Sequence, residues 1–137
     1  MVSLHANSFG KESAHGSRIY HDVDGADNVN SNSVSLTENI ANSYSIDDTA
    51  SAVKHVGNLT VLDHFENFSS APSSAATLIE LGFLSNEDDA RKLKEMSKNP
   101  EIAAKQIAEG INNHVLKTTP ELSNNTRNIS EQSLELQ

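Results

Sequence analysis

The chain contains no cysteine and no tryptophan, and it is poor in aromatic residues. The absence of cysteine excludes a disulfide framework and a thiolate zinc site. Aromatic residues make up 4% of the sequence and apolar residues 36%, so little material is available for a large core. At 137 residues, the chain is therefore expected to form one domain with a core of modest size.

Basic residues are also scarce. Ten lysines and arginines stand against nineteen acidic residues, which gives a net charge of −9. This balance argues against nucleic acid and against an anionic membrane surface as partners, because both attract clustered lysine and arginine. No stretch approaches the ~20 apolar residues of a membrane span, and no basic region followed by an apolar run marks a signal peptide. The sequence thus predicts neither a membrane span nor a signal peptide.

Four segments of the sequence are predicted to be strands. Three of them are short: Val2–His5, Arg18–His21 and Leu59–Phe65. The fourth, Ala75–Phe83, is an apolar run interrupted only by Glu80, which is typical of a central strand buried on both faces. An unpaired charge in such a strand is costly. Glu80 is therefore expected to be neutral, paired, or at a cleft that water or a metal ion can reach.

Three helices are predicted from apolar spacing and capping signals. Leu36, Ile40 and Tyr44 recur every four residues and define one helical face. A second helix is expected to begin at Ser85, which has Asp88 three residues later, the spacing of a capping box. The third carries an apolar stripe suited to packing on a sheet, formed by Ala103, Ile107, Ile111 and Val115.

These elements predict an α/β fold with a mixed, mainly parallel sheet flanked by helices. Apolar periodicity is lost after Leu116. The expected organisation is therefore one domain over residues 1–116, followed by a polar, disordered tail over residues 117–137.

Two short motifs carry a resemblance to a known family. Ser3–Asn7 reads Ser-Leu-His-Ala-Asn, and Glu80–Asn86 reads Glu-Leu-Gly-Phe-Leu-Ser-Asn. Both resemble motifs of the zinc-dependent N-acetylmuramoyl-L-alanine amidases of bacterial cell walls and phage lysis systems. The resemblance covers residues 1–116, and its motifs occur in the order that the family has.

The resemblance implies a site and an activity. It implies that His5 is a zinc ligand and that Glu80 is the general acid/base in hydrolysis of the amide joining muramic acid to L-alanine. The implied substrate is peptidoglycan, and the implied location is extracellular, in the cell wall or periplasm. Taken from the residues alone, His5 also fits a strand-end histidine bonded to backbone, and Glu80 an ion-paired carboxylate.

The sequence departs from the family at its start. Members place a first metal histidine and an acidic metal ligand upstream of the Ser-x-His-x-Asn motif, and here that motif begins two residues after Met1. Two of the three expected zinc ligands are absent, so the chain resembles the C-terminal part of an amidase domain. Two functions stay open: an amidase that works when the missing half is supplied, and a non-catalytic remnant that binds cell wall or a protein.

Two other histidines are candidates for replacement zinc ligands. His21 and His64 each end a predicted strand, which would allow them to approach the same edge of the sheet. No His-x-x-x-His pair or other helical ligand spacing occurs. The remaining histidines, His15, His55 and His114, are expected to have ordinary polar or loop roles.

Overall fold

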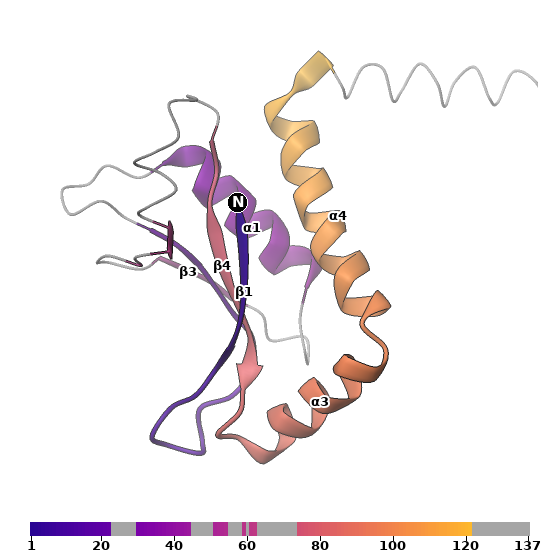
Figure 1. Cartoon of the computed structure of the whole chain (residues 1–137). Helices are drawn as coiled ribbons and strands as arrows, with labels where there is room; N and C mark the ends of the chain where they lie inside the picture. Colours follow the sequence, from indigo (N-terminus) through magenta and orange to yellow (C-terminus); the bar gives the residue numbers. More distant parts are fainter. Residues whose placement is uncertain (23–29, 45–50, 55–58, 60, 63–73, 122–137) are drawn as a thin grey trace, which may run out of the picture.

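The structure is a computed structural model that describes residues 1–22, 30–44, 51–54, 59, 61–62 and 74–121. It contains four strands and three long helices in the order β1 (Val2–Asn7), β2 (Arg18–His21), α1 (Ser31–Ser43), β3 (Ser51–Lys54), β4 (Thr77–Phe83), α3 (Glu87–Lys98) and α4 (Glu101–Thr118). Figure 1 shows the strands side by side and the helices beside them.

The strands form one mixed sheet in the order β1-β4-β2-β3. Strand β4 pairs in parallel with β1 and antiparallel with β2, and β2 pairs in parallel with β3. The predicted α/β fold with a mixed, mainly parallel sheet is confirmed, and β4 has the internal position expected of the apolar run around Glu80. Strand β1 lies at one edge of the sheet, where its second side has no neighbouring strand among the described residues.

One predicted strand is wrong where the structure describes it. Residues 61–62 of the expected strand Leu59–Phe65 are helical, and the backbone N–H of Leu62 donates to the Leu59 carbonyl at 2.7 Å. Residues 60 and 63–65 lie outside the described residues. A short apolar run is ambiguous because the same side chains suit a buried turn of helix. The strand missing from the prediction is Ser51–Lys54, which pairs with β2.

The main core lies between one face of the sheet and two helices. Ile19 of β2 and Ile79 of β4 are fully buried there. The buried residues that pack with them are Leu36, Ile40 and Tyr44 in or next to α1, and Ala103 and Ile107 of α4. The predicted apolar face of α1 is confirmed, and that of α4 is confirmed for Ala103, Ile107 and the partly buried Ile111, whereas Val115 is not part of this core. A smaller cluster of Leu62, Ala76 and Leu78 forms separately.

Helix α3 begins one residue later than its sequence suggested. Its N-cap is Asn86, whose side-chain oxygen accepts a hydrogen bond from the Asp89 backbone N–H at 3.1 Å. Ser85, the predicted cap, instead accepts a hydrogen bond from the Phe9 backbone N–H at 3.0 Å. Serine and asparagine are both favourable N-cap residues. Asn86 is the cap here because the Ser85 hydroxyl is bonded to Phe9, which is distant in sequence.

Helix α4 continues slightly beyond the predicted end of the domain. It ends at Thr118, so it includes the first two residues of the predicted tail. Residues 122–137 lie outside the described residues, and a disordered tail stays a prediction for them. Within the described part of the chain, no helix is long and apolar enough to cross a membrane.

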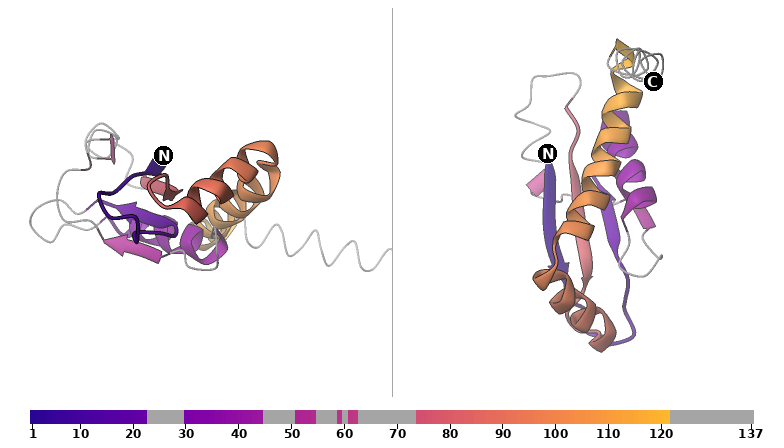
Figure 2. Two further views of the ribbon diagram at one scale, coloured as in Figure 1. Left: turned by 90° about the horizontal axis from the view of Figure 1, so that it is seen from below. Right: turned by 90° about the vertical axis from the view of Figure 1, so that its right-hand side faces the viewer.

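The crossing of α1 and α4, visible in Figure 2, depends on a glycine. A Cβ atom at Gly110 would lie 2.5 Å from the Ile40 Cα and 2.9 Å from the Asn39 carbonyl oxygen. Alanine normally stabilises a helix relative to glycine. Here we expect Gly110→Ala to destabilise the protein by about 1–3 kcal/mol, because backbone must move to admit the methyl group. Thermal unfolding should show a clear drop in Tm.

A matched control is available at Gly10, where an added Cβ meets nothing within 4 Å. Gly10→Ala should leave the Tm nearly unchanged. If Gly110→Ala raised the Tm, helix propensity would outweigh the contact, and the close approach of α1 and α4 would be wrong.

Candidate active site

The structure brings the two motif residues together. His5 of β1 and Glu80 of β4 are directly opposite each other on neighbouring parallel strands. Neighbouring strands lie about 4.8 Å apart, and opposite residues point to the same face of a sheet. Two side chains from distant parts of the sequence therefore stand next to each other, near the carboxyl ends of their strands.

A β-bulge in β4 adds an aromatic side chain to this face. After the His5–Glu80 pair, the next pair in the register is Asn7 with Phe83, so β4 contains one extra residue at this point. Such a bulge shifts the alternation of side chains, and it places Phe83 on the same face as Glu80. The Leu81 carbonyl at the bulge accepts hydrogen bonds from the Ser17 hydroxyl at 3.1 Å and the Tyr44 hydroxyl at 3.3 Å.

Arg18 approaches Glu80 from the other side. It is the antiparallel partner of Glu80 on β2, so His5, Glu80 and Arg18 form a row across three strands. The Arg18 guanidinium donates to the Ser17 carbonyl at 2.9 Å and lies 6.0 Å from the centre of the Phe83 ring. Sequence reasoning missed Arg18 and Phe83 because neither the strand register nor the bulge can be derived from one sequence.

The environment of Glu80 disfavours its charged form. Its Oε2 atom is buried and has no hydrogen-bond partner among the described residues. Burial raises the pKa of the carboxyl group above its ordinary value, and the neighbouring His5 opposes this shift. His5 itself is exposed, with its Nε2 atom 3.0 Å from the Ser3 hydroxyl. A carboxyl group with a raised pKa is suited to accept and return a proton near neutral pH.

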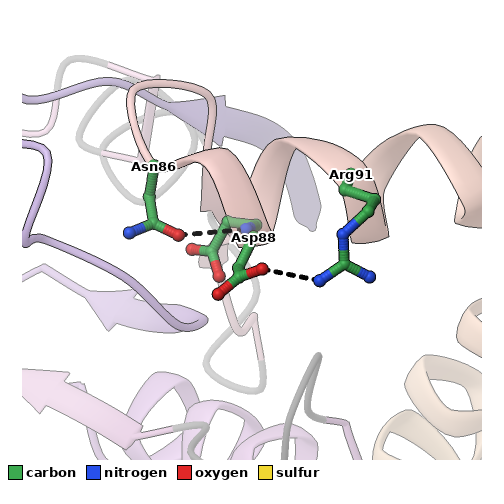
Figure 3. Close-up of polar contacts among 4 residues, drawn as sticks. Asn86, Asp88 and Arg91 are labelled. Carbon is green, nitrogen blue, oxygen red and sulfur yellow. Dashed lines mark hydrogen bonds and ion pairs between the residues drawn. The ribbon is translucent and has the colours of Figure 1, made fainter.

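The Ser-Asn end of the second motif has a structural role in these contacts. The Ser85 hydroxyl accepts a hydrogen bond from the Phe9 backbone, and the Asn86 amide donates to the Glu12 carbonyl at 2.7 Å. Both bonds hold the loop between β1 and β2 against the end of β4. Figure 3 shows Asn86 at the start of α3, beside the exposed ion pair between Asp88 and Arg91.

Asp89 is a buried residue that links the end of the β1–β2 loop to the end of β4. It is 1% exposed, and its Oδ2 atom accepts hydrogen bonds from the backbone N–H groups of Gly16 at 2.8 Å and Phe83 at 2.9 Å. These bonds join the residues just before β2 to the bulged end of β4. Asp89 therefore fixes the two segments that carry Arg18 and Phe83.

Of the two histidines that the sequence offers as replacement ligands, only His21 is described, and it lies away from this site. Side chains alternate along a strand, so His21 lies on the same face of β2 as buried Ile19 and on the opposite face from Arg18. It therefore points to the helix-covered face, away from His5. Its Nδ1 lies 3.2 Å from the Asp22 carbonyl oxygen. His114 lies in α4, and burial lowers its pKa. His55 and His64 lie outside the described residues.

The described residues do not form a complete zinc site. Among them, no group of three or more histidine, aspartate or glutamate side chains is arranged to hold a metal ion. Catalytic zinc sites use three protein ligands and one open position. His5 can supply one nitrogen ligand, which is fewer than such a site needs.

Comparison with known proteins shows the family of the chain. A family model described as N-acetylmuramoyl-L-alanine amidase matches residues 1–113. The chain belongs to this amidase family. The family expected from the Ser3–Asn7 and Glu80–Asn86 motifs is therefore confirmed. No curated protein sequence matches the chain significantly.

Solved amidase structures share the fold. The CwlD amidase from Clostridioides difficile, in complex with the GerS lipoprotein, is 26% identical with a TM-score of 0.62; the match covers 83% of this chain and 53% of CwlD. The catalytic domain of CwlV, an N-acetylmuramoyl-L-alanine amidase from Bacillus (Paenibacillus) polymyxa var. colistinus, is 22% identical with a TM-score of 0.53 and coverages of 85% and 55%. The catalytic domain of CD27L, an endolysin targeting Clostridia difficile, is 23% identical with a TM-score of 0.54 and coverages of 82% and 53%.

The chain thus spans about half the length of the amidase structures that it matches. The likeness covers the sheet and helices that position His5 and Glu80. The roles of these two residues are not tested by the fold, and they stay predictions.

Proposed function

We propose that this chain carries the Glu80 half of a zinc-dependent N-acetylmuramoyl-L-alanine amidase active site. The reaction is hydrolysis of the amide bond between the lactyl group of muramic acid and L-alanine in peptidoglycan. This activity belongs to a complete catalytic domain, of which the chain supplies one part. Its place of action is the cell wall or periplasm, outside the cell membrane.

One observation carries the proposal: His5 and Glu80 are opposite each other, and Glu80 has a buried oxygen without a hydrogen-bond partner among the described residues. A carboxylate needed only for stability would be expected to have an ion pair or hydrogen bonds there. Instead, its second oxygen remains available to another group. This is the arrangement expected of a carboxyl group that exchanges a proton with water or substrate.

Glu80 has the chemistry for both proton transfers of amide hydrolysis. With its pKa raised by burial, it accepts a proton from the attacking water and returns that proton to the departing amine of L-alanine. Arg18, the neighbour of Glu80 on β2, forms no ion pair with it among the described residues, and the effect of burial on the pKa of Glu80 exceeds the opposing effect of His5. The role needs the substrate amide to lie above the row formed by His5, Glu80 and Arg18.

Strand β1 supports a place for the rest of the domain to join. Among the described residues it is an edge strand, and its Leu4 side chain is 56% exposed. An open edge with an exposed leucine is a place where a further strand pairs. In our proposal the remaining zinc ligands come from the part of the amidase domain that the matched residues do not cover, and His5 is the ligand contributed here.

Reassembly of two halves tests the proposal. This chain is co-expressed with the part of CwlD that lies outside its matched region, and release of dye from labelled peptidoglycan is measured. The two halves of CwlD expressed in the same way are the positive control. We expect peptidoglycan hydrolysis only when both halves are present.

An inactive hybrid of the correct size, beside an active pair of CwlD halves, would contradict the proposal. That result would favour the second function left open by the sequence, a non-catalytic module that binds cell wall or a protein.

Metal analysis gives a prediction for the chain alone. We expect the isolated 137-residue chain to retain much less than one zinc ion per molecule after dialysis against a weak chelator, because His5 is one ligand where three are needed. Inductively coupled plasma mass spectrometry measures the content. One tightly held zinc per chain would overturn this expectation and direct mutagenesis to His64.

A further inference from the structure

Arg18 carries a positive charge next to Glu80, the proposed proton-transfer residue. It is directly opposite Glu80, yet it forms no ion pair with any carboxylate in the described part of the chain. One guanidinium nitrogen donates to the Ser17 carbonyl at 2.9 Å. A guanidinium group has five N–H donors, so this single bond leaves most of them available.

Phe83 lies beside the Arg18 guanidinium group. The Arg18 guanidinium carbon lies 6.0 Å from the centre of the Phe83 ring, within range of a cation–π interaction. Phe83 reaches this position through the β4 bulge, and the Asp89 carboxylate holds its backbone. The Ser17 carbonyl and the Phe83 ring thus contact the guanidinium group, while Glu80 lies opposite Arg18 on the neighbouring strand without an ion pair among the described residues.

We propose that Arg18 is a specificity residue that binds a carboxylate of the stem peptide, on the peptide side of the scissile amide. This inference rests on the proposed function. The planar guanidinium group matches a carboxylate through two parallel hydrogen bonds. A ring beside the guanidinium limits its freedom, which reduces the entropy lost on binding.

The spacing of the sheet fits this assignment. Neighbouring strands lie about 4.8 Å apart, and one residue of extended peptide spans about 3.3–3.6 Å. With the amide above Glu80, a carboxylate on the residue that follows L-alanine lies one to two residue lengths away. That distance is similar to the distance between the neighbouring strands β4 and β2, and the arginine side chain spans the remainder.

A binding experiment separates this role from catalysis. The 15N-labelled chain is titrated with N-acetylmuramoyl-L-alanyl-D-glutamate and, separately, with the diamide of the same compound. We expect the carboxylate ligand to bind at least about tenfold more tightly than the diamide, with shifts at the Arg18 side chain. Arg18→Gln should remove this preference, and Arg18→Lys should keep part of it, since lysine retains the charge without the planar fork.

Arg91→Gln is the matched control. It makes the same change of charge at an arginine on the exposed surface of α3, where the partner is Asp88. It should leave the preference for the carboxylate ligand intact. The ratio of the affinities for the carboxylate ligand and for the diamide separates the two roles. Substitution of an arginine that is only structural would change both affinities by a similar factor.

Two results overturn the inference: a wild-type chain with no preference for the carboxylate, or an Arg18→Gln variant that keeps the preference. Either result leaves the amidase proposal standing, because binding is measured without turnover. Conversely, an inactive hybrid with the Arg18-dependent preference intact would refute the proposed function and not the binding role.

Discussion

Glu80→Gln should reduce the turnover of the reassembled amidase by about 10²- to 10⁴-fold, the usual cost of losing a positioned general acid/base. Glutamine keeps the size and shape of the side chain but cannot accept a proton from the attacking water. The zinc content of the reassembled protein should stay near the wild-type value, because Glu80 is assigned to proton transfer and not to ligation. Initial rates of peptidoglycan hydrolysis and metal analysis on the same samples measure both quantities.

Two further variants make the result specific. Glu95→Gln changes an exposed carboxylate of α3 that pairs with Lys98, and it should leave turnover unchanged. His5→Ala should lose zinc and activity together, unlike Glu80→Gln. If Glu80→Gln kept more than about a tenth of wild-type turnover, Glu80 would be a structural carboxylate and its proposed role would be wrong.

Asp89→Ala should have the largest effect on stability. The substitution removes the acceptor for the buried N–H groups of Gly16 and Phe83 and leaves both without a partner. Each unsatisfied buried donor costs about 1–3 kcal/mol, so we expect a loss of about 2–5 kcal/mol in the free energy of unfolding. Urea denaturation followed by circular dichroism measures it.

The neighbouring aspartate provides the control. Asp88 has a side chain that is 74% exposed, and it pairs with Arg91 on the surface of α3. Exposed pairs of this kind contribute about 0–1 kcal/mol, so Asp88→Ala should change stability little. Equal effects of the two substitutions would show that Asp89 does not hold the loop and the β4 bulge together.

The sequence predicted the central part of the fold because burial there follows simple periodicity. The apolar run around Glu80 became β4, and the apolar residues spaced along α1 and α4 became the main core. The prediction of a strand at Leu59–Phe65 is wrong at residues 61–62, which are helical. Two or three apolar residues fit a turn of helix as well as a strand. Strand β3 was missed because Ser51–Lys54 carries little apolar pattern.

The candidate site was only partly accessible to sequence reasoning. The motifs identified His5 and Glu80, and the parallel register of β1 and β4 brings them together. Arg18 and Phe83 join them through an antiparallel register and a bulge, which arise from contacts distant in sequence. The buried acceptor Asp89 directly follows Glu87 and Asp88 in the sequence, and only the folded chain distinguishes it from exposed Asp88.

Identification of the bond that is cleaved tests the central claim most directly. Purified peptidoglycan is digested with the reassembled hybrid of this chain and the CwlD half, and the products are analysed by mass spectrometry. We expect stem peptides with a free L-alanine amino terminus, together with glycan strands whose muramic acid carries a free lactyl carboxylate. Products cleaved within the peptide or the glycan, or an undigested wall beside an active pair of CwlD halves, would contradict the assignment of this chain as part of a muramoyl-L-alanine amidase.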